Sequence, residues 1–248
     1  MKTIESTLLS SCKNLLHAYS TRTGGYSALG NNLAYHVGDV KEDIDKNQNE
    51  LALRLGYSFE RLVHMNQIHG DSITVIENFK TRYEVPTCDA LITQEKNRPL
   101  MVMVADCIPV LIYDPIKEVI AAIHAGRAGV FSEIIPKSIA RMQKRYGSNP
   151  KDILVHLGPS IHQCCYEVGA EIKEEAQRAG YTYAIKIDND RYFLDLLAIT
   201  DRQLKDSGVE EEHIESSDQC TACNTDIFYS YRAEKNKCGR FAGIIMLK

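Results

Sequence analysis

The sequence lacks any long apolar run: no stretch approaches the roughly 20 consecutive apolar residues of a membrane-spanning helix. It also lacks a secretion signal at its start, because Met1-Lys2-Thr3-Ile4-Glu5 carries an early acidic residue and no apolar segment follows. We therefore expect a protein that works in the cytoplasm and has no membrane partner.

An excess of basic residues is missing as well. Lysine and arginine total 29 against 33 acidic residues, which gives a formal net charge of -4 and an isoelectric point near 6.1. Domains that bind nucleic acid usually carry a basic surface, so the charge balance argues against a nucleic-acid partner. The common signatures G-x-S-x-G, H-E-x-x-H, Walker A and G-x-G-x-x-G are also absent, which removes the enzyme classes they mark.

No repeat, low-complexity segment or Pro/Gly/Ser-rich linker divides the chain. We expect residues 1–248 to form a single domain and a monomer. Helix signals occur in four places. They predict one helix with a capping box of Asp39 and Glu42 and an end at Gly56, one capped by Ser132 and ended by Gly147, one from about Val168 to Ala179, and one from about Leu194 to Ser207.

Strands are predicted from short apolar runs bounded by turn residues, several of them apolar on both faces. They are Arg61–Gln67, Ser72–Ile76, Leu100–Val104, Val110–Tyr113, Val119–Ile123, Ile153–Leu157 and Phe241–Leu247. These strands come in groups rather than in strict alternation with helices. The order predicts an α+β fold, a layered domain of mixed β-sheets flanked by helices.

Three histidine or cysteine residues follow predicted buried strands, where loops on a rigid scaffold often carry sites. They are His69, Cys107 and His124. Two imidazoles and one thiolate suit zinc, and three protein ligands leave a fourth position open, as in catalytic rather than structural zinc sites. The gaps of 38 and 17 residues match no zinc-finger spacing. Capping or packing roles, and a metal-free Cys107–His124 nucleophile pair, therefore remain alternatives.

Without a secretion signal, the eight cysteines are expected to be thiols, metal ligands or nucleophiles rather than disulfides. A second group, Cys164-Cys165 with Cys220 and Cys223, could form a four-thiolate zinc site or a redox pair. We favour a packing role, because the first two are expected to open a helix, where adjacent side chains point in different directions. Cys12, Cys88 and Cys238 are interpreted as structural, and His156 as a hydrogen-bonded core residue.

Polar residues beside these motifs are candidates for substrate contact or catalysis. Arg22 and Arg127 could bind a phosphate or carboxylate group, and Gln67 could orient a substrate. Asp106, next to Cys107, could act as a general acid or base, support a metal ligand, or cap backbone amides.

The ordered motifs of the chain resemble the YfiH-like family, also called the laccase-domain or multicopper polyphenol oxidoreductase family. The resemblance covers nearly the whole chain. It is carried by Tyr19-Ser20-Thr21-Arg22-Thr23-Gly24-Gly25, His36-Val37-Gly38-Asp39, Gln67-Ile68-His69-Gly70, Ala105-Asp106-Cys107-Ile108-Pro109-Val110, His124-Ala125-Gly126, Gly158-Pro159-Ser160-Ile161, Cys164-Cys165-Tyr166-Glu167-Val168-Gly169, Leu194-Asp195-Leu196, Cys220-Thr221, Tyr229-Ser230-Tyr231-Arg232 and Gly239-Arg240.

The resemblance implies a metal at His69, Cys107 and His124, with zinc expected and copper as a substitute. It implies phosphorolysis of adenosine, inosine and methylthioadenosine, and deamination of adenosine. It also implies a peptidoglycan-editing amidase acting on UDP-N-acetylmuramoyl-amino acids as an alternative, and a fold shared with cysteine-hydrolase-like toxins. A small-molecule partner is expected in each case.

Two other functions and two departures from the family pattern bear on these expectations. Copper oxidation of phenols is disfavoured, because a multicopper centre needs many histidines, typically in H-x-H pairs, and the eight here form none. A nucleoside sensor without turnover is the non-enzymatic alternative.

The family's H-A-G-W-R-G reads His124-Ala125-Gly126-Arg127-Ala128-Gly129 here, so the tryptophan is missing and the arginine comes one place early. His162 stands where the family has glycine.

Overall fold

The computed structural model describes residues 1–78, 81–235 and 238–248. Its α-helices are α1 (Thr7–Ser10), α2 (Lys41–Leu55), α3 (Arg127–Phe131), α4 (Ile134–Tyr146), α5 (Ala170–Arg178), α6 (Leu196–Asp206) and α7 (Tyr231–Glu234). In the described part of the chain, no helix has the length and apolar character needed to cross a bilayer.

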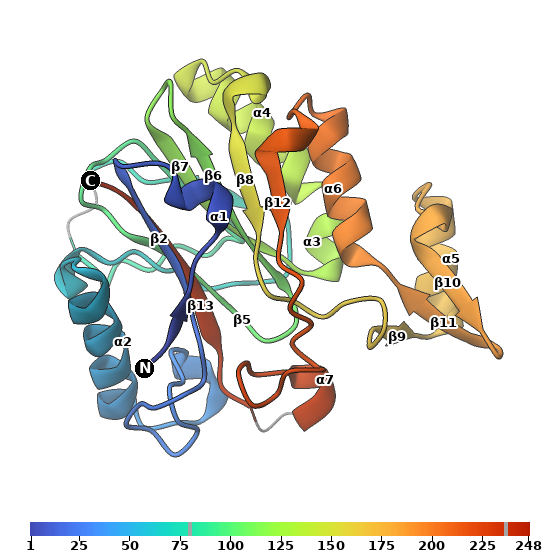
Figure 1. The fold of residues 1–248 in the computed structure, drawn as a ribbon, viewed down its shortest axis with the longest axis horizontal. Helices are drawn as coiled ribbons and strands as arrows, with labels where there is room; N and C mark the ends of the chain where they lie inside the picture. The colour runs from blue at the N-terminus through green and yellow to red at the C-terminus, as the bar shows by residue number, and fades with distance from the viewer. Residues whose placement is uncertain (79–80, 236–237) are drawn as a thin grey trace.

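The strands form three sheets in the described chain (Figure 1). A six-stranded mixed sheet has the order β12 (Ile214–Ser216), β8 (Leu154–Leu157), β6 (Ile108–Asp114), β7 (Val119–Ala125), β4 (Ala90–Thr93) and β3 (Ile73–Val75). A four-stranded antiparallel sheet has the order β1 (Thr3–Ile4), β2 (Leu15–Ser20), β13 (Phe241–Leu247) and β5 (Leu100–Val104). A small sheet contains β10 (Ile185–Asp188), β11 (Arg191–Leu194) and β9 (Glu167–Val168).

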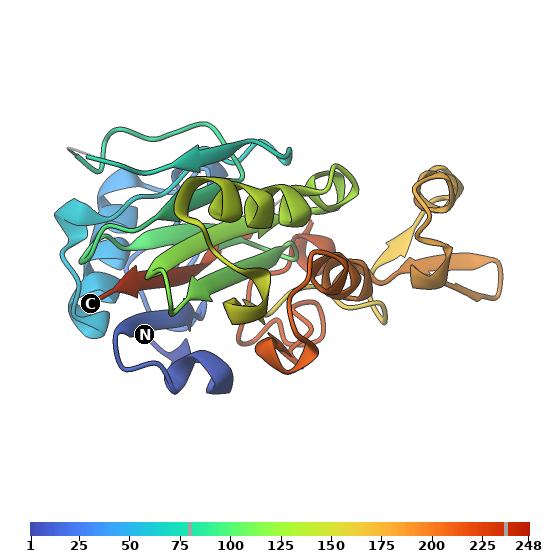
Figure 2. The same cartoon turned by 90° about the horizontal axis from the view of Figure 1, so that it is seen from above.

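The two large sheets are stacked face to face. Helices α4 and α6 cover the outer face of the six-stranded sheet, and α2 covers the outer face of the four-stranded sheet. Along β6 and β7, alternate side chains enter two different cores, because successive residues of a strand point to opposite faces. One core lies against α4 and α6, and the other lies between the sheets. On β5 and β13 the alternation separates the inter-sheet core from a third core beneath α2. The turned view in Figure 2 shows these layers.

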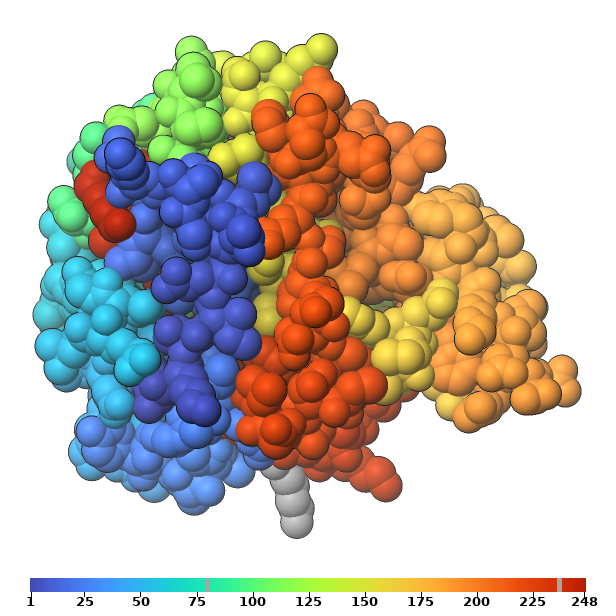
Figure 3. Space-filling model, in the orientation of Figure 1, coloured from blue at the N-terminus to red at the C-terminus, as the bar shows by residue number. Residues whose placement is uncertain are grey.

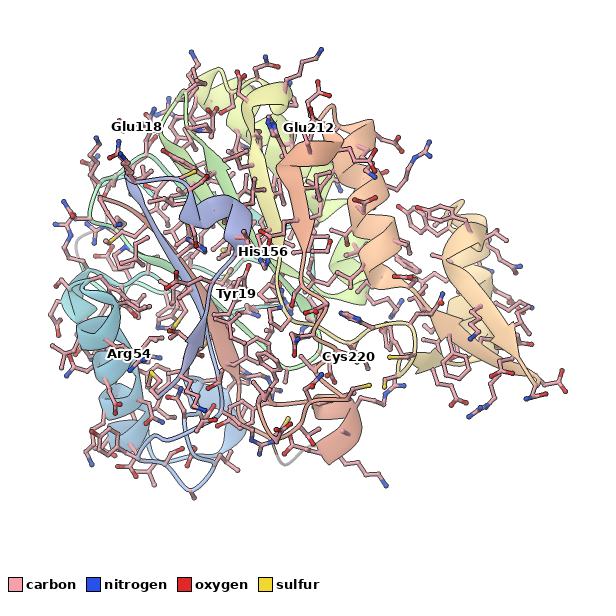
Figure 4. The ribbon with its side chains drawn as sticks, viewed as in Figure 1. Tyr19, Arg54, Glu118, His156, Glu212 and Cys220 are labelled. Carbon is pink, nitrogen blue, oxygen red and sulfur yellow. The ribbon has the colours of Figure 1, made fainter. Side chains whose placement is uncertain are left out.

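Tyr19 and His156 connect the two large sheets in the inter-sheet core. Tyr19 belongs to β2 and His156 to β8, and the His156 Nδ1 atom lies 2.8 Å from the Tyr19 hydroxyl (Figure 4). Both residues are buried. The expectation that His156 is a hydrogen-bonded core residue is therefore confirmed.

The small sheet and α5 project from one side of the layered body (Figures 1 and 2). In the space-filling view, this unit stands off from the blue N-terminal part and borders the orange and red C-terminal part (Figure 3). Its apolar residues, including Ala176 and Leu194, continue the core beneath α6.

The α+β class and the mixed sheets agree with the sequence prediction, as do six of the seven predicted strands to within two residues at each end. The predicted ends of α2 at Gly56 and of α4 at Gly147 are also confirmed. The predicted starts of α2 and α4 were wrong. α2 is capped at Val40 rather than Asp39, whose carboxylate accepts from Asn32. Ser132 ends α3, an unexpected short helix, and α4 starts after Glu133 in a left-handed conformation.

The predicted strand Arg61–Gln67 is not a strand. Val63 and Asn66 make only isolated bridges, and Arg61 ends the 3-10 turn Phe59–Arg61. Beside the edge strand β5, the Gln67 side-chain amide donates to the Met103 carbonyl at 2.7 Å and accepts from the Met103 N–H at 2.9 Å. A side chain therefore takes the place of the backbone pairing that the apolar pattern predicted. The predicted strand Ser72–Ile76 shortens to β3.

Candidate metal centre

His69, Cys107 and His124 meet at the end of the stacked sheets. The chain leaves the four-stranded sheet at Val104 and enters the six-stranded sheet at Ile108, so Cys107 lies in the short connection between the sheets. The possible ligand atoms of the three residues all lie within 4.8 Å of one another. The structure thus brings together the three residues that the sequence predicted as metal ligands.

The two histidines reach this point in different ways. His124 lies within β7, next to Ile123 and Ala125, whose side chains face the helix-covered core. Alternation along the strand therefore turns His124 toward the inter-sheet side, where it is buried. His69 lies in an irregular loop and has a left-handed backbone with φ of 58°. Their rings meet edge to face, with centroids 4.7 Å apart.

Asp89, which the sequence analysis missed, ties these two ligand segments together. Its Oδ1 atom lies 2.7 Å from Nδ1 of His124 and accepts the His69 N–H at 3.0 Å. Its Oδ2 atom accepts the Gly70 N–H at 2.7 Å. A carboxylate at Nδ1 fixes the imidazole orientation and leaves Nε2 for another partner, as in carboxylate–histidine–zinc sites. Asp89 directly precedes β4, a strand that was not predicted.

The electrostatics of the site couple Cys107 to the imidazoles. Burial alone would raise the pKa of the Cys107 thiol, but His124 and His69 outweigh this effect and bring its pKa to about 6. Burial alone would lower the pKa of His124, but Cys107 and the carboxylate of Asp89 raise it to about 9. In the metal-free protein, a thiolate beside an imidazolium is therefore favoured near neutral pH.

Gly126 lets the chain after His124 pass close to this centre. A Cβ atom at this position would lie 3.2 Å from the Cys107 sulfur and 3.3 Å from Cδ2 of His69. Contacts this short are tight, so a larger residue would crowd the donor atoms. This requirement explains the glycine of His124-Ala125-Gly126 in physical terms.

The three residues line a cavity of about 510 Å³. Its lining combines the metal candidates with aromatic, apolar and basic side chains. These are Gln67, His69, Met103, Val104, Ala105, Asp106, Cys107, His124, Arg127, Ile161, Tyr166, Leu196, Tyr231, Arg232 and Arg240. The volume lies in the usual range for a small-molecule site. The sequence analysis missed several of these residues as site residues because they come from strands, helices and loops far apart in the chain.

Three predicted polar residues line the cavity, and two of them are held by backbone groups. Asp106, whose φ is 89°, accepts hydrogen bonds from the Thr221 hydroxyl at 2.7 Å and from the Arg232 N–H at 2.6 Å. Gln67 is bound on both sides by the Met103 backbone. Arg127 is paired with Glu175 of α5.

The structure does not bring Arg22 into this cavity. Its guanidinium donates to the Thr225 carbonyl at 2.6 Å, pairs with Glu234 at 2.9 Å and stacks over the Tyr229 ring. These contacts hold the segment before α7. The Arg22 guanidinium, predicted to bind a phosphate or carboxylate of the substrate, is therefore already paired with Glu234 and Tyr229.

Solved structures share this fold over most of the chain. A Bacillus licheniformis protein called YfiH has a TM-score of 0.90 at 29% identity, covering 94% of this chain and 93% of that one. YlmD from Geobacillus stearothermophilus has a TM-score of 0.89 at 28% identity, covering 98% and 94%. These similarities confirm the YfiH-like fold that the motifs indicated.

Sequence relatives point to the same family. A purine nucleoside phosphorylase of Corynebacterium glutamicum is 36% identical over 233 residues, 92% of this chain and 93% of that protein. A purine nucleoside phosphorylase of Bacteroides thetaiotaomicron is 33% identical over 254 residues, covering 96% and 94%. A family model described as multi-copper polyphenol oxidoreductase laccase matches residues 16–248, and the chain belongs to that family.

Proposed function

We propose that the chain is a zinc-dependent purine nucleoside enzyme that cleaves adenosine, inosine and methylthioadenosine with phosphate and also deaminates adenosine. The observation that carries this proposal is the convergence of His69, Cys107 and His124 in a cavity that also holds tyrosine and arginine side chains. The relatives named purine nucleoside phosphorylases, similar over more than nine tenths of the chain, support the substrate class.

The donor set fits zinc. Zinc ligands lie about 2.0–2.3 Å from the metal, so the donor atoms of one site must lie close together, as they do here within 4.8 Å. Asp89 supplies the carboxylate that orients such a histidine. When bound, zinc would supply a Lewis acid that lowers the pKa of water and polarises substrate oxygen atoms.

A multicopper centre fits less well. Among the described residues, the two side-chain groups that could hold a metal contain only two histidines, His69 and His124. The other group consists of cysteines alone. Copper replacing zinc at the first group remains compatible with its nitrogen and sulfur donors, since copper binds such sites more tightly than zinc does.

The arginines and tyrosines of the cavity suit a nucleoside and phosphate. Arg127, Arg232 and Arg240 line the cavity, where their positive charges would attract a phosphate dianion. Each guanidinium also has a protein partner, Arg127 the Glu175 carboxylate and Arg232 and Arg240 backbone carbonyl groups, so phosphate would bind the N–H groups that these contacts leave available. The rings of Tyr166 and Tyr231 would pack against a purine. In phosphorolysis, a phosphate oxygen attacks the ribose C1′ atom, the bond from C1′ to the purine nitrogen breaks, and its electron pair leaves with the base, which takes up a proton.

Asp106 and Gln67 are proposed to position the cavity wall rather than to react. Both side chains are engaged by neighbouring backbone groups, and their loops carry Cys107 and His69. An Asp106→Asn variant should keep the hydroxyl contact with Thr221 but weaken the contact with the Arg232 N–H. We expect a higher KM for nucleoside, and we expect the pH profile of kcat to stay unchanged because no proton transfer is lost.

The test combines zinc content with turnover on the same samples. Wild type, Cys107→Ala and a matched Cys12→Ala control are assayed with adenosine and phosphate, following release of adenine, inosine and ribose 1-phosphate. We expect Cys107→Ala to lose the zinc of this centre together with turnover, while Cys12→Ala keeps both. Turnover by a metal-free wild-type protein would overturn the zinc dependence and make Cys107 a nucleophile.

A second candidate function is amide hydrolysis on a UDP-N-acetylmuramoyl-amino acid. The line from Asp89 through His124 to Cys107, with a thiol pKa of about 6, is the arrangement of a cysteine nucleophile, its base and an orienting carboxylate. The arginines would suit the diphosphate of this substrate. Release of the amino acid by chelator-treated protein, blocked by thiol alkylation, would favour this function over the zinc-dependent one.

A further inference from the structure

Four cysteines outside the candidate metal centre converge from two distant segments. Cys164 and Cys165 lie in a turn between β8 and β9, and Cys220 and Cys223 lie in a turn between β12 and α7. Their four sulfur atoms all lie within 4.8 Å of one another. Cys220, labelled in Figure 4, marks the position of this cluster. The expectation that Cys164 and Cys165 open a helix was wrong, because α5 begins only at Ala170.

The spacing of these sulfur atoms matches a tetrahedral zinc site. With zinc–sulfur bonds of about 2.3 Å, the corners of a tetrahedron are about 3.8 Å apart. The Cys164 sulfur lies 3.7 Å from the Cys165 sulfur and 3.8 Å from the Cys223 sulfur, and the sulfur atoms of Cys165 and Cys223 are 3.3 Å apart. A disulfide would need about 2.05 Å, and all these cysteines are free.

The backbone around Cys220 favours a thiolate. The His162 N–H donates to its sulfur at 3.4 Å. Backbone donors pointing at sulfur stabilise the charged form that binds a metal. Cys164 and Cys223 are exposed, so burial in a packed core does not explain why these thiols lie so close together. A bound cation would explain it.

The cluster joins the segment that contributes Ile161 and Tyr166 to the cavity lining with the segment that leads into α7. Thr221, between the two cysteines of the second turn, donates its N–H to the Ser160 carbonyl at 2.9 Å and its hydroxyl to Asp106. The Ile161 N–H donates to the Asp106 carbonyl at 2.8 Å. Ile161 and Tyr166 line the cavity on either side of the first cysteine pair. A bond network between the turns would therefore fix this part of the lining.

We propose that Cys164, Cys165, Cys220 and Cys223 bind one zinc ion in a structural site that shares no residue with the His69, Cys107 and His124 centre. Four protein ligands close the coordination shell, which is the structural rather than the catalytic pattern. The zinc clamps the segment after β8 to the segment before α7 and so holds Ile161, Tyr166 and Asp106 in place. This site does not depend on the proposed function of the cavity.

The test measures zinc per chain in wild type, Cys107→Ala, Cys223→Ser and the double variant, each purified in the presence of reductant. If both sites bind zinc, we expect about two ions, one, one and none, respectively. If only the four-cysteine site binds zinc, wild type and Cys107→Ala each hold about one and Cys223→Ser holds none. If the four-cysteine site does not bind zinc, Cys107→Ala holds no zinc. This result distinguishes failure of the four-cysteine proposal from failure of the zinc proposal for His69, Cys107 and His124.

Cobalt titration gives a spectroscopic readout in the Cys107→Ala background. Co²⁺ should produce the strong thiolate-to-metal charge-transfer absorption of a four-thiolate site, which Cys223→Ser or Cys164→Ser should largely remove. A matched Cys12→Ser variant should retain it. Circular dichroism verifies that each variant is folded. Absence of the absorption in folded Cys107→Ala would overturn the proposal.

The clamp itself is tested by hydrogen exchange. The Thr221 amide, which donates to Ser160 across the two segments, and the Ile161 amide, which donates to Asp106, should exchange faster in Cys223→Ser than in wild type. The Ala122 amide, in the middle of β7, serves as an internal reference and should not change. Unchanged exchange at Ile161 and Thr221 after zinc loss would overturn the clamping role.

Discussion

At the scale of single residues, the carboxylate of Asp89 has the largest effect on the candidate metal centre. It holds the Nδ1 side of His124 and, through backbone N–H groups, the loop of His69. Two of the three donors therefore depend on one side chain that itself donates nothing to a metal.

Asp89→Asn should weaken zinc binding about 10- to 100-fold, the usual effect of losing a partner that orients a metal-bound histidine. Competition with a chelator measures this change. Asp71→Asn is the matched control, since Asp71 is exposed and pairs with Lys137 on the surface. Equal zinc affinity of Asp89→Asn and wild type would contradict the role assigned to this carboxylate.

The ionisation of Cys107 gives a prediction for the metal-free protein. Because the thiolate is the reactive form and its pKa is brought to about 6, alkylation of Cys107 should rise with pH around 6 and be nearly complete at pH 8. Alkylation of an unperturbed thiol would rise around pH 8.5, since the pKa of a free cysteine is about 8.5. Iodoacetamide labelling, followed by peptide mass spectrometry, measures the midpoint. A midpoint near 8.5 would show that the imidazoles do not stabilise the thiolate.

At this scale the sequence could identify the ligands but not their supports. His69, Cys107 and His124 are unusual residue types beside apolar runs, so they were visible as candidates. Asp89 and Arg232 carry no local signal, because their partners lie 35 and 126 residues away in the chain. Arg22 was wrongly predicted to line the site, because the residues next to it in the sequence do not indicate that Glu234 and Tyr229 are its partners.

At the scale of elements, α6 connects a cap to the cavity. Asp195 caps this helix, its carboxylate accepting the Ala198 N–H at 2.9 Å, and Leu196 in the first turn lines the cavity. Loss of the cap removes a partner from a helix-end donor.

Asp195→Ala should lower the free energy of unfolding by about 1 kcal/mol. Urea unfolding measures this loss. Asp206→Ala on the same helix is the control, because its pair with Arg202 is largely exposed and such pairs contribute about 0.5 kcal/mol or less. Equal losses in the two variants would argue against the cap as a stabilising contact.

The success of the element predictions followed the strength of the local pattern. β5 and β13 are buried on both faces and were predicted with their observed bounds. The segment Arg61–Gln67 has apolar residues only at Leu62, Val63 and Met65, and it makes only isolated bridges. Pairing is a property of both partners, so one strand's sequence cannot settle it. Short strands such as β4 and β9 were missed because few residues carry their pattern.

At the scale of the whole molecule, metal binding should appear as stability. A ligand that binds only the folded state at 100 times its dissociation constant raises the free energy of unfolding by about 2.7 kcal/mol per site. Calorimetry with and without chelator should therefore show a lower Tm in the stripped protein. Cys107→Ala should retain part of the difference and Cys107→Ala with Cys223→Ser none. A residual chelator effect in this double variant would indicate binding elsewhere.

The layered α+β arrangement was predictable at this scale because grouped strands and separate helices leave few alternatives. That residues 1–248 form one domain and a monomer stays a prediction. The pairing of sheets into layers beneath α2 and α4 came only from the structure, since it depends on which faces of β5, β7 and β13 meet.

The position of β13 has a consequence for how the molecule is made. It is the last strand in chain order, yet it lies between β2 and β5 in its sheet. During synthesis on a ribosome, β2 therefore emerges long before β13, its partner on the side facing β5. The inter-sheet core cannot close until Phe241–Leu247 has left the exit tunnel. The nascent chain must keep the apolar side chains of both sheets soluble until then, which makes it a natural client for chaperones that shield such surfaces.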